Sequence, residues 1–197
     1  MDVEAVTIDA LGTLVALRDP VPALRAALAA RGLERDADEV RRAFDVEAAY
    51  YVPRSHDGRD ATSLADLRAR CTAVFLCELG AGLDDFPFTD CLAFELLPGA
   101  RDALELLSPL KLCVVSNWDI GLHEHLARLG VDLPVVTSAE AGAPKPDPRI
   151  FVRALELVGA RTAVHVGDSR ADEEGAHAAG LRFEPAPLAD AARRIVA

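Results

Sequence analysis

The spacing of apolar residues divides the chain into three stretches. Residues 3–8 form a short, β-branched apolar run, which predicts a buried strand. From about residue 17 to residue 94, apolar residues recur every three or four positions, which predicts amphipathic helices and no further strand. We expect helices over residues 19–31, 36–52 and 63–79, the last opened by a capping box of Ser63 and Asp66.

Beyond residue 97, short apolar runs alternate with segments of helical period. Parallel strands that alternate with helices form a sheet with helices on both faces. We therefore predict an α/β fold with a doubly wound parallel sheet, built from residues 1–16 and 95–197, and an all-α insertion at 17–94. After the first strand, the expected strands of the sheet are 111–115, 135–137, 163–166 and 181–183.

The predicted strands end on polar side chains. Asp9 ends the first strand, Ser116 and Asn117 follow the strand at 111–115, and Asp168 follows the strand at 163–166. Ligands of such sheets bind in the crevice at the carboxyl ends of the strands. A carboxylate in an apolar setting costs several kcal/mol unless it is paired or coordinates a metal. Asp9 is therefore either paired with residues elsewhere in the chain or used for chemistry.

Composition and charge indicate which kinds of partner and which cell compartment to expect. The chain is 51% hydrophobic, which suffices for a core, and its net charge of −11 argues against a non-specific nucleic-acid binder. No apolar stretch is long enough to span a membrane, and the N-terminus lacks a signal-peptide pattern, so we expect a cytoplasmic protein without a membrane partner. The four cysteines match no zinc signature, and we expect them to be reduced core residues.

Four sequence blocks, in this order, carry a family resemblance. They are Asp9-x-Leu-Gly-Thr, the run from Val114 to Asn117, the segment 145–151 that starts with Lys145, and the segment 165–172. Together they resemble the four motifs of the haloacid dehalogenase-like (HAD) superfamily of hydrolases, and the insertion resembles its C1-type helical cap. The resemblance implies a Rossmann-like core with strand order 5-4-1-2-3, the core strands being numbered along the chain.

The resemblance also implies roles for the matching residues. Asp9 is the expected nucleophile, with Thr13 in the same motif. Ser116 and Asn117 offer hydrogen bonds to a bound anion, and Lys145 neutralises negative charge on the nucleophile and on the transferred group. The implied cofactor is Mg²⁺, which prefers oxygen ligands. The implied ligands are Asp9, the backbone carbonyl of Leu11, Asp168 and Asp172, with Glu173 as the alternative to Asp172.

Leu11 departs from the family pattern. Phosphatases of the superfamily carry a second aspartate at this position, which protonates the leaving alcohol and then activates water. We expect a magnesium-dependent phosphoryl hydrolase or phosphotransferase that acts on a small anionic, phosphorylated molecule without this acid. The alternatives are a 2-haloacid dehalogenase-like hydrolase that uses no metal, and a non-catalytic protein that binds a phosphate ester.

The insertion supplies candidates for substrate contacts. A polar loop is expected at residues 53–60, and loops of this kind commonly carry function. Tyr50, Tyr51, Arg54 and His56 lie in or next to this loop, and one of them could replace the missing acid. We expect His165, by contrast, to be a packed strand residue.

Overall fold

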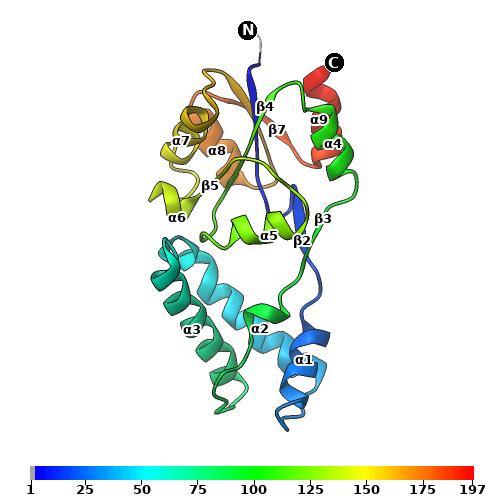
Figure 1. Cartoon of the computed structure of the whole chain (residues 1–197), viewed down its shortest axis with the longest axis vertical. Coiled ribbons are helices and arrows are strands. Elements are labelled where there is room, and N and C mark those ends of the chain that lie inside the picture. The colour runs from blue at the N-terminus through cyan, green and yellow to red at the C-terminus, as the bar shows by residue number, and fades with distance from the viewer. Residues whose placement is uncertain (1–2) are drawn as a thin grey trace.

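The computed structural model describes residues 3–197 and contains a five-stranded parallel sheet (Figure 1). Its strand order is β5-β4-β1-β6-β7. Numbered along the chain within this sheet, the order reads 5-4-1-2-3 from the β7 edge, which confirms the predicted order. The strands are β1 (Ala5–Ile8), β4 (Lys111–Ser116), β5 (Val135–Thr137), β6 (Ala163–Gly167) and β7 (Arg182–Pro185).

Helices cover both faces of this sheet, as the doubly wound prediction requires (Figure 1). Alternate residues of β4 point to opposite faces, so Val114 packs into one hydrophobic cluster while Cys113 and Val115 pack into the other. The helices of the Val114 face are α4 (Ala100–Leu106), α5 (Leu122–Arg128) and α9 (Leu188–Val196). The helices of the opposite face are α7 (Arg149–Val158) and α8 (Arg170–Ala178), and the short α6 (Ser138–Ala141) follows β5.

The insertion forms a helical layer that lies beyond the carboxyl ends of the strands (Figure 1). Its helices share a hydrophobic cluster of their own, in which Phe75 and Phe88 pack with ring centroids 4.9 Å apart. The elements of this layer are α1 (Val21–Ala29), α2 (Ala37–Tyr51), α3 (Ala61–Glu78) and the 3₁₀ helices η1 (Val52–Asp57) and η2 (Thr89–Cys91).

Two local predictions in the insertion are wrong. Helix α3 begins at Ala61 because Asp60, in an extended conformation, accepts a hydrogen bond from the Ser63 amide, and the Ser63 hydroxyl accepts one from the Asp60 amide. The capping box therefore joins Asp60 and Ser63, not Ser63 and Asp66. Most of the expected loop at 53–60 is the 3₁₀ helix η1, which follows α2 directly after Tyr51.

A short antiparallel ribbon joins the insertion to the sheet domain. It pairs β2 (Val15–Leu17) with β3 (Phe94–Leu96), in a region for which no strand was predicted. Three residues per strand are too few to show an alternating pattern. The expected domain boundaries, at 16/17 and 94/95, fall within this ribbon and stay a prediction.

The cysteines are all free, but they are not all core residues. Cys71, Cys91 and Cys113 are buried, whereas Cys77 is exposed near the end of α3, which corrects the expectation for that residue. Within residues 3–197, no helix combines the length and the apolar character needed to cross a membrane.

Candidate active site

The polar residues that follow the strands meet in one place, at the carboxyl ends of β1, β4 and β6. Asp9 follows β1, Ser116 is the last residue of β4, and Asp168 follows β6. Lys145 reaches the same point from the segment between α6 and α7. A cavity of about 460 Å³ lies above these residues, and residues of the helical insertion line its far side.

Lys145 is buried and lies between two of the carboxylates of the site. Its Nζ lies 2.5 Å from Oδ1 of Asp9 and 2.5 Å from Oδ1 of Asp172, and it donates to the Val115 carbonyl at 3.2 Å. Burial alone lowers the pKa of this ammonium, but the two carboxylates outweigh burial and leave the pKa above its usual value. Lys145 is therefore held in its charged form against the candidate nucleophile.

Two side chains from the end of β4 fix this arrangement. The Ser116 hydroxyl donates to Oδ1 of Asp9 at 3.0 Å. Asn117 accepts a hydrogen bond from the Lys145 amide at 2.7 Å and donates one to the Lys145 carbonyl at 3.0 Å. Both ends of the Asn117 amide thus hold the lysine backbone. The structure therefore gives Asn117 a positioning role, beside the anion contact that the sequence suggested.

Three carboxylates form an acidic cluster around this lysine. Oxygens of Asp9, Asp168 and Asp172 all lie within 4.8 Å of one another. Burial and the neighbouring charges of Asp9 and Asp172 raise the pKa of Asp168, so the cluster disfavours a third negative charge. Glu173 is exposed and does not belong to this cluster. Of the two acids considered for the last motif, Asp172 is the one that faces Asp9.

Asp172 is held by several donors at once. Burial opposes its ionisation, but the hydrogen bond from His165 and the charge of Lys145 lower its pKa below the usual value. His165 Nε2 lies 2.9 Å from Oδ1, and the Ser169 hydroxyl lies 2.5 Å from Oδ2. His165 is fully buried in β6, as expected, and its Nδ1 lies 2.9 Å from the Thr7 hydroxyl. It packs in the core and also orients Asp172.

The loop after Asp9 follows the sides of this cluster. Gly12 has a φ of +88°, and a Cβ atom there would lie 2.0 Å from Oδ2 of Asp168, so only glycine fits. The Thr13 hydroxyl is buried and has no hydrogen-bond partner within residues 3–197. Leu11 is 49% exposed and lines the cavity. The loop residues 10–14 contain no carboxylic acid that could take the place of the missing general acid.

The four substrate-contact candidates separate in space. Tyr51 lines the cavity, and its hydroxyl donates to Asp119 at 2.8 Å. Tyr50 and Arg54 pack against each other outside the cavity lining, with the guanidinium 4.1 Å from the ring centroid. His56 also lies outside the lining, and its Nε2 is 4.0 Å from a carboxylate oxygen of Asp57.

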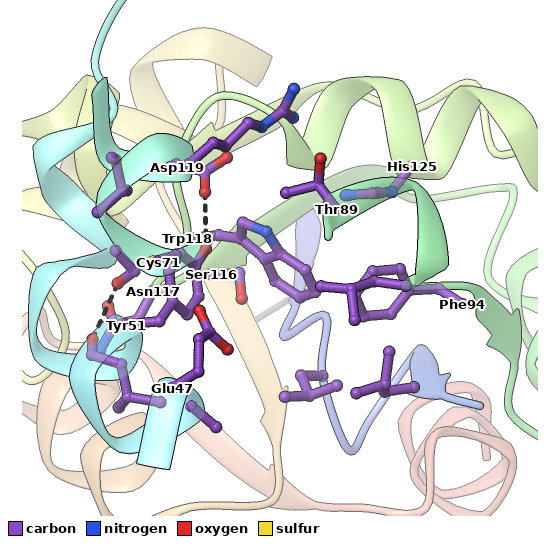
Figure 2. Close-up of a pocket in the computed structure, with 18 of the residues that line it drawn as sticks. Glu47, Tyr51, Cys71, Thr89, Phe94, Ser116, Asn117, Trp118, Asp119 and His125 are labelled. Atoms are coloured by element: carbon purple, nitrogen blue, oxygen red, sulfur yellow. Dashed lines mark hydrogen bonds between the residues drawn. The ribbon is translucent and has the colours of Figure 1, made fainter. Parts of the chain in front are cut away.

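The cavity brings in polar residues that the sequence did not single out. Glu47 and Asp119 both line it, and both are less than a tenth exposed (Figure 2). Burial raises the pKa of Glu47, only partly offset by a hydrogen bond with Cys71. A signal for Glu47 was available, because it lies on the apolar face of α2, between Phe44 and Tyr51, where a charge is unexpected. Asp119 has a weaker signal, its place two residues after Asn117.

Comparison with known sequences places the chain among hydrolases. The sequence matches the family of haloacid dehalogenase-like hydrolases over residues 3–180. It is 43% identical, over 103 residues, to the haloacid dehalogenase-like hydrolase domain-containing protein 3 of Bos taurus. This match covers 48% of the present chain and 41% of that protein, so the chain spans about two fifths of the relative's length.

Solved structures of similar fold include members of the same family. The L-2-haloacid dehalogenase of Xanthobacter autotrophicus, solved with chloropropionic acid covalently bound, superposes with a TM-score of 0.66 at 23% identity, over 92% of this chain and 76% of that one. The HAD-hydrolase YfnB of Bacillus subtilis, solved with magnesium, superposes with a TM-score of 0.67 at 18% identity, over 93% and 88%. At these identities the likeness establishes a shared fold.

Proposed function

The chain belongs to the haloacid dehalogenase-like hydrolase family, and on this premise we propose that it is a magnesium-dependent hydrolase or phosphotransferase of a small phosphorylated molecule. One observation carries the proposal. Lys145 is buried in contact with Asp9 and Asp172, and Asp168 lies beside them at the floor of the cavity. A nucleophile, a fixed cation and an acidic cluster are the groups that phosphoryl transfer needs at one point.

Asp9 is the nucleophile in this proposal. Within residues 3–197, Oδ1 accepts hydrogen bonds from Lys145 and Ser116, and none reaches Oδ2, which leaves Oδ2 free to attack. Its attack on phosphorus forms an acyl phosphate of Asp9, while the bond from phosphorus to the leaving oxygen breaks and the leaving group departs. Water then attacks the phosphorus and regenerates the carboxylate. Lys145 and Ser116 stabilise the negative charge that develops in both steps.

The donor chemistry of the acidic cluster fits magnesium. Mg²⁺ is usually held by one or two carboxylates together with waters and substrate phosphates. Asp9 and Asp168 would bind it directly, with the Leu11 carbonyl. Both Asp172 oxygens already accept hydrogen bonds, so Asp172 would act on the ion through water. When bound, the ion supplies positive charge that stabilises the phosphoryl oxygens.

Leu11 determines which leaving groups react well. Among the four candidate replacements for the missing acid, Tyr51 is the one that lines the cavity. Burial and the Asp119 carboxylate raise the pKa of Tyr51 well above its usual value, so this hydroxyl is a weak acid. We therefore expect aryl and acyl phosphates, whose leaving groups depart without a proton, to react faster than alkyl phosphates.

The test is a panel of aryl, acyl and alkyl phosphates, assayed with Mg²⁺ and with excess EDTA. We expect turnover of the aryl and acyl phosphates that EDTA abolishes. Equal rates in both conditions, or no turnover across the panel, would exclude the proposal. In addition, Leu11→Asp should raise the alkyl phosphatase rate by roughly 10²-fold. Leu157→Asp, the same change at an exposed leucine outside the cavity, should leave it unchanged.

Metal-free dehalogenation is the second candidate. Leu11 favours it, because halide leaves unprotonated and needs no acid at that position. The cluster of Asp9, Asp168 and Asp172 favours the metal-dependent reaction instead. Release of halide from 2-chloropropionate in EDTA would decide for the dehalogenase. Phosphate-ester binding without product, measured by calorimetry, would indicate the non-catalytic alternative.

A further inference from the structure

The cavity above Asp9 has walls that are mostly apolar. Its volume of about 460 Å³ lies in the range of small-molecule sites. Helices α2 and α3 and the ribbon strand β3 contribute to these walls, together with the loop after Asp9 and the segment after β4. The apolar side chains that define them include Leu11, Phe44, Leu67, Phe88, Phe94 and Trp118.

One wall is aromatic. Phe94 and Trp118 meet edge to face with ring centroids 5.1 Å apart, and the His125 ring lies 4.6 Å from Phe94 (Figure 2). Burial lowers the pKa of His125, which favours its neutral form. Water beside such a wall has few hydrogen-bond partners, so an apolar group that replaces it gains free energy.

The charged groups that contact one another at the floor of the cavity are those around Asp9 and Lys145. The walls also carry a few polar side chains, among them Glu47, Arg68, Thr89 and Asp119. Asp119 is already engaged by the Tyr51 hydroxyl and by the Gly121 amide, and Glu47 is hydrogen-bonded with Cys71. A sugar phosphate presents a hydroxyl on almost every carbon, and each hydroxyl needs a partner when it is buried. Because most of the wall is apolar, the few polar side chains there, Arg68 and Thr89 among them, cannot pair with a hydroxyl on every carbon.

We propose that the ligand is a phosphate monoester whose organic part is predominantly apolar, aromatic or aliphatic. This inference takes from the proposed function only that the ligand carries a phosphate group. Lys145 and Ser116 would hold the phosphoryl group at the floor, and the organic part would fill the apolar chamber. Leu11 then contributes to ligand binding. It stands where the family's phosphatases carry the general acid, and its apolar side chain extends the apolar wall of the cavity.

Unreactive phosphonates test this inference without turnover. Their affinities are measured by titration calorimetry in Mg²⁺, for methyl, butyl, hexyl and phenyl phosphonate and for 3,4-dihydroxybutyl phosphonate. We expect the dissociation constant to fall about 3- to 4-fold per added methylene. The dihydroxybutyl compound should bind at least about tenfold more weakly than butyl phosphonate, and the heat-capacity change should become more negative as the chain grows.

A pair of leucine variants checks where the organic part binds. Leu11→Asn should weaken hexyl phosphonate by roughly 3- to 10-fold and methyl phosphonate much less. Leu157→Asn, the same change at an exposed leucine outside the cavity, should alter neither. Equal weakening of both phosphonates by Leu11→Asn would contradict the assigned position.

The outcomes separate this inference from the proposed function. If affinity is independent of chain length, if the dihydroxy compound binds as tightly as butyl phosphonate, or if no phosphonate binds, the inference is wrong whatever the enzyme hydrolyses. If the apolar series binds as expected while no phosphate ester is hydrolysed, the inference stands and the proposed hydrolysis fails.

Discussion

Replacing Lys145 with methionine should strongly destabilise the metal-free protein. The Lys145 side chain is 4% exposed, and it separates two carboxylates that are 7% and 1% exposed, those of Asp9 and Asp172. Removing one partner of a buried ion pair typically costs about 3–5 kcal/mol, because a charge is left without compensation. A carboxyl can escape by protonation, which from its ordinary pKa of 3.8 costs about 4 kcal/mol at pH 7. Both arguments give a loss of about 3–5 kcal/mol.

Urea unfolding in EDTA, at pH 7 and at pH 4, measures this loss. Without the lysine, the facing carboxylates gain a raised pKa, so the variant loses stability as the pH rises through that value. The difference from the parent should therefore be largest at pH 7 and should shrink towards pH 4. Lys111→Met, at the other lysine of the sequence, changes an exposed side chain and should cost less than about 0.5 kcal/mol.

A companion variant tests the cause of this loss. Lys145→Met combined with Asp172→Asn should recover part of it at pH 7, because a single carboxylate then remains. A loss below about 1 kcal/mol for Lys145→Met at pH 7, or a loss that does not change with pH, would refute this account of the charge cluster.

Three further variants probe other groups at the cavity. Glu47→Gln should raise the free energy of unfolding at pH 8 by roughly 1 kcal/mol and change it less at pH 4, since the raised pKa of the buried carboxyl means that stability is lost as the pH rises through it; urea titrations at the two pH values decide. Gly12→Ala should destabilise the protein and weaken Mg²⁺ binding, because the new Cβ would collide with the Asp168 carboxylate at a positive φ; thermal unfolding with and without Mg²⁺ shows both effects. Asp168→Asn should stabilise the protein in EDTA by removing one of three clustered charges, yet abolish stimulation by Mg²⁺; a stability loss in EDTA would contradict the raised pKa of Asp168.

The centre of the main sheet was predictable because β1, β4 and β6 are buried on both faces. Such strands are continuous apolar runs, and the runs at 111–115 and 163–166 correspond to β4 and β6. The ribbon of β2 and β3 gave no such signal, since it is three residues long and only partly buried. The start of α3 was misplaced because Asp60 and Ser63 make equally good capping residues, and backbone geometry chooses between them.

The candidate site was predictable at the ends of the strands and at the residues of the family motifs. Asp9 and Ser116 meet as expected because parallel strands bring their carboxyl ends to one edge. Lys145 and Asp172 lie outside the strands, and the family motifs predicted their place beside Asp9. The contacts that orient them were not predictable. The hydrogen bonds from Asn117 to Lys145 and from Tyr51 to Asp119 join residues 28 and 68 positions apart, and no local pattern specifies such a pair.

The sequence alone determined the fold class through its local hydrophobic period. The strand order and the residues of the charged floor followed from the resemblance of its short motifs to those of the family. Only the tertiary structure decided what surrounds Asp9. It excluded Tyr50, Arg54 and His56 from the cavity, and it placed Glu47 and the apolar walls within it. The physical reason is that a cavity forms where two separately packed layers face each other, and its walls depend on how those layers meet.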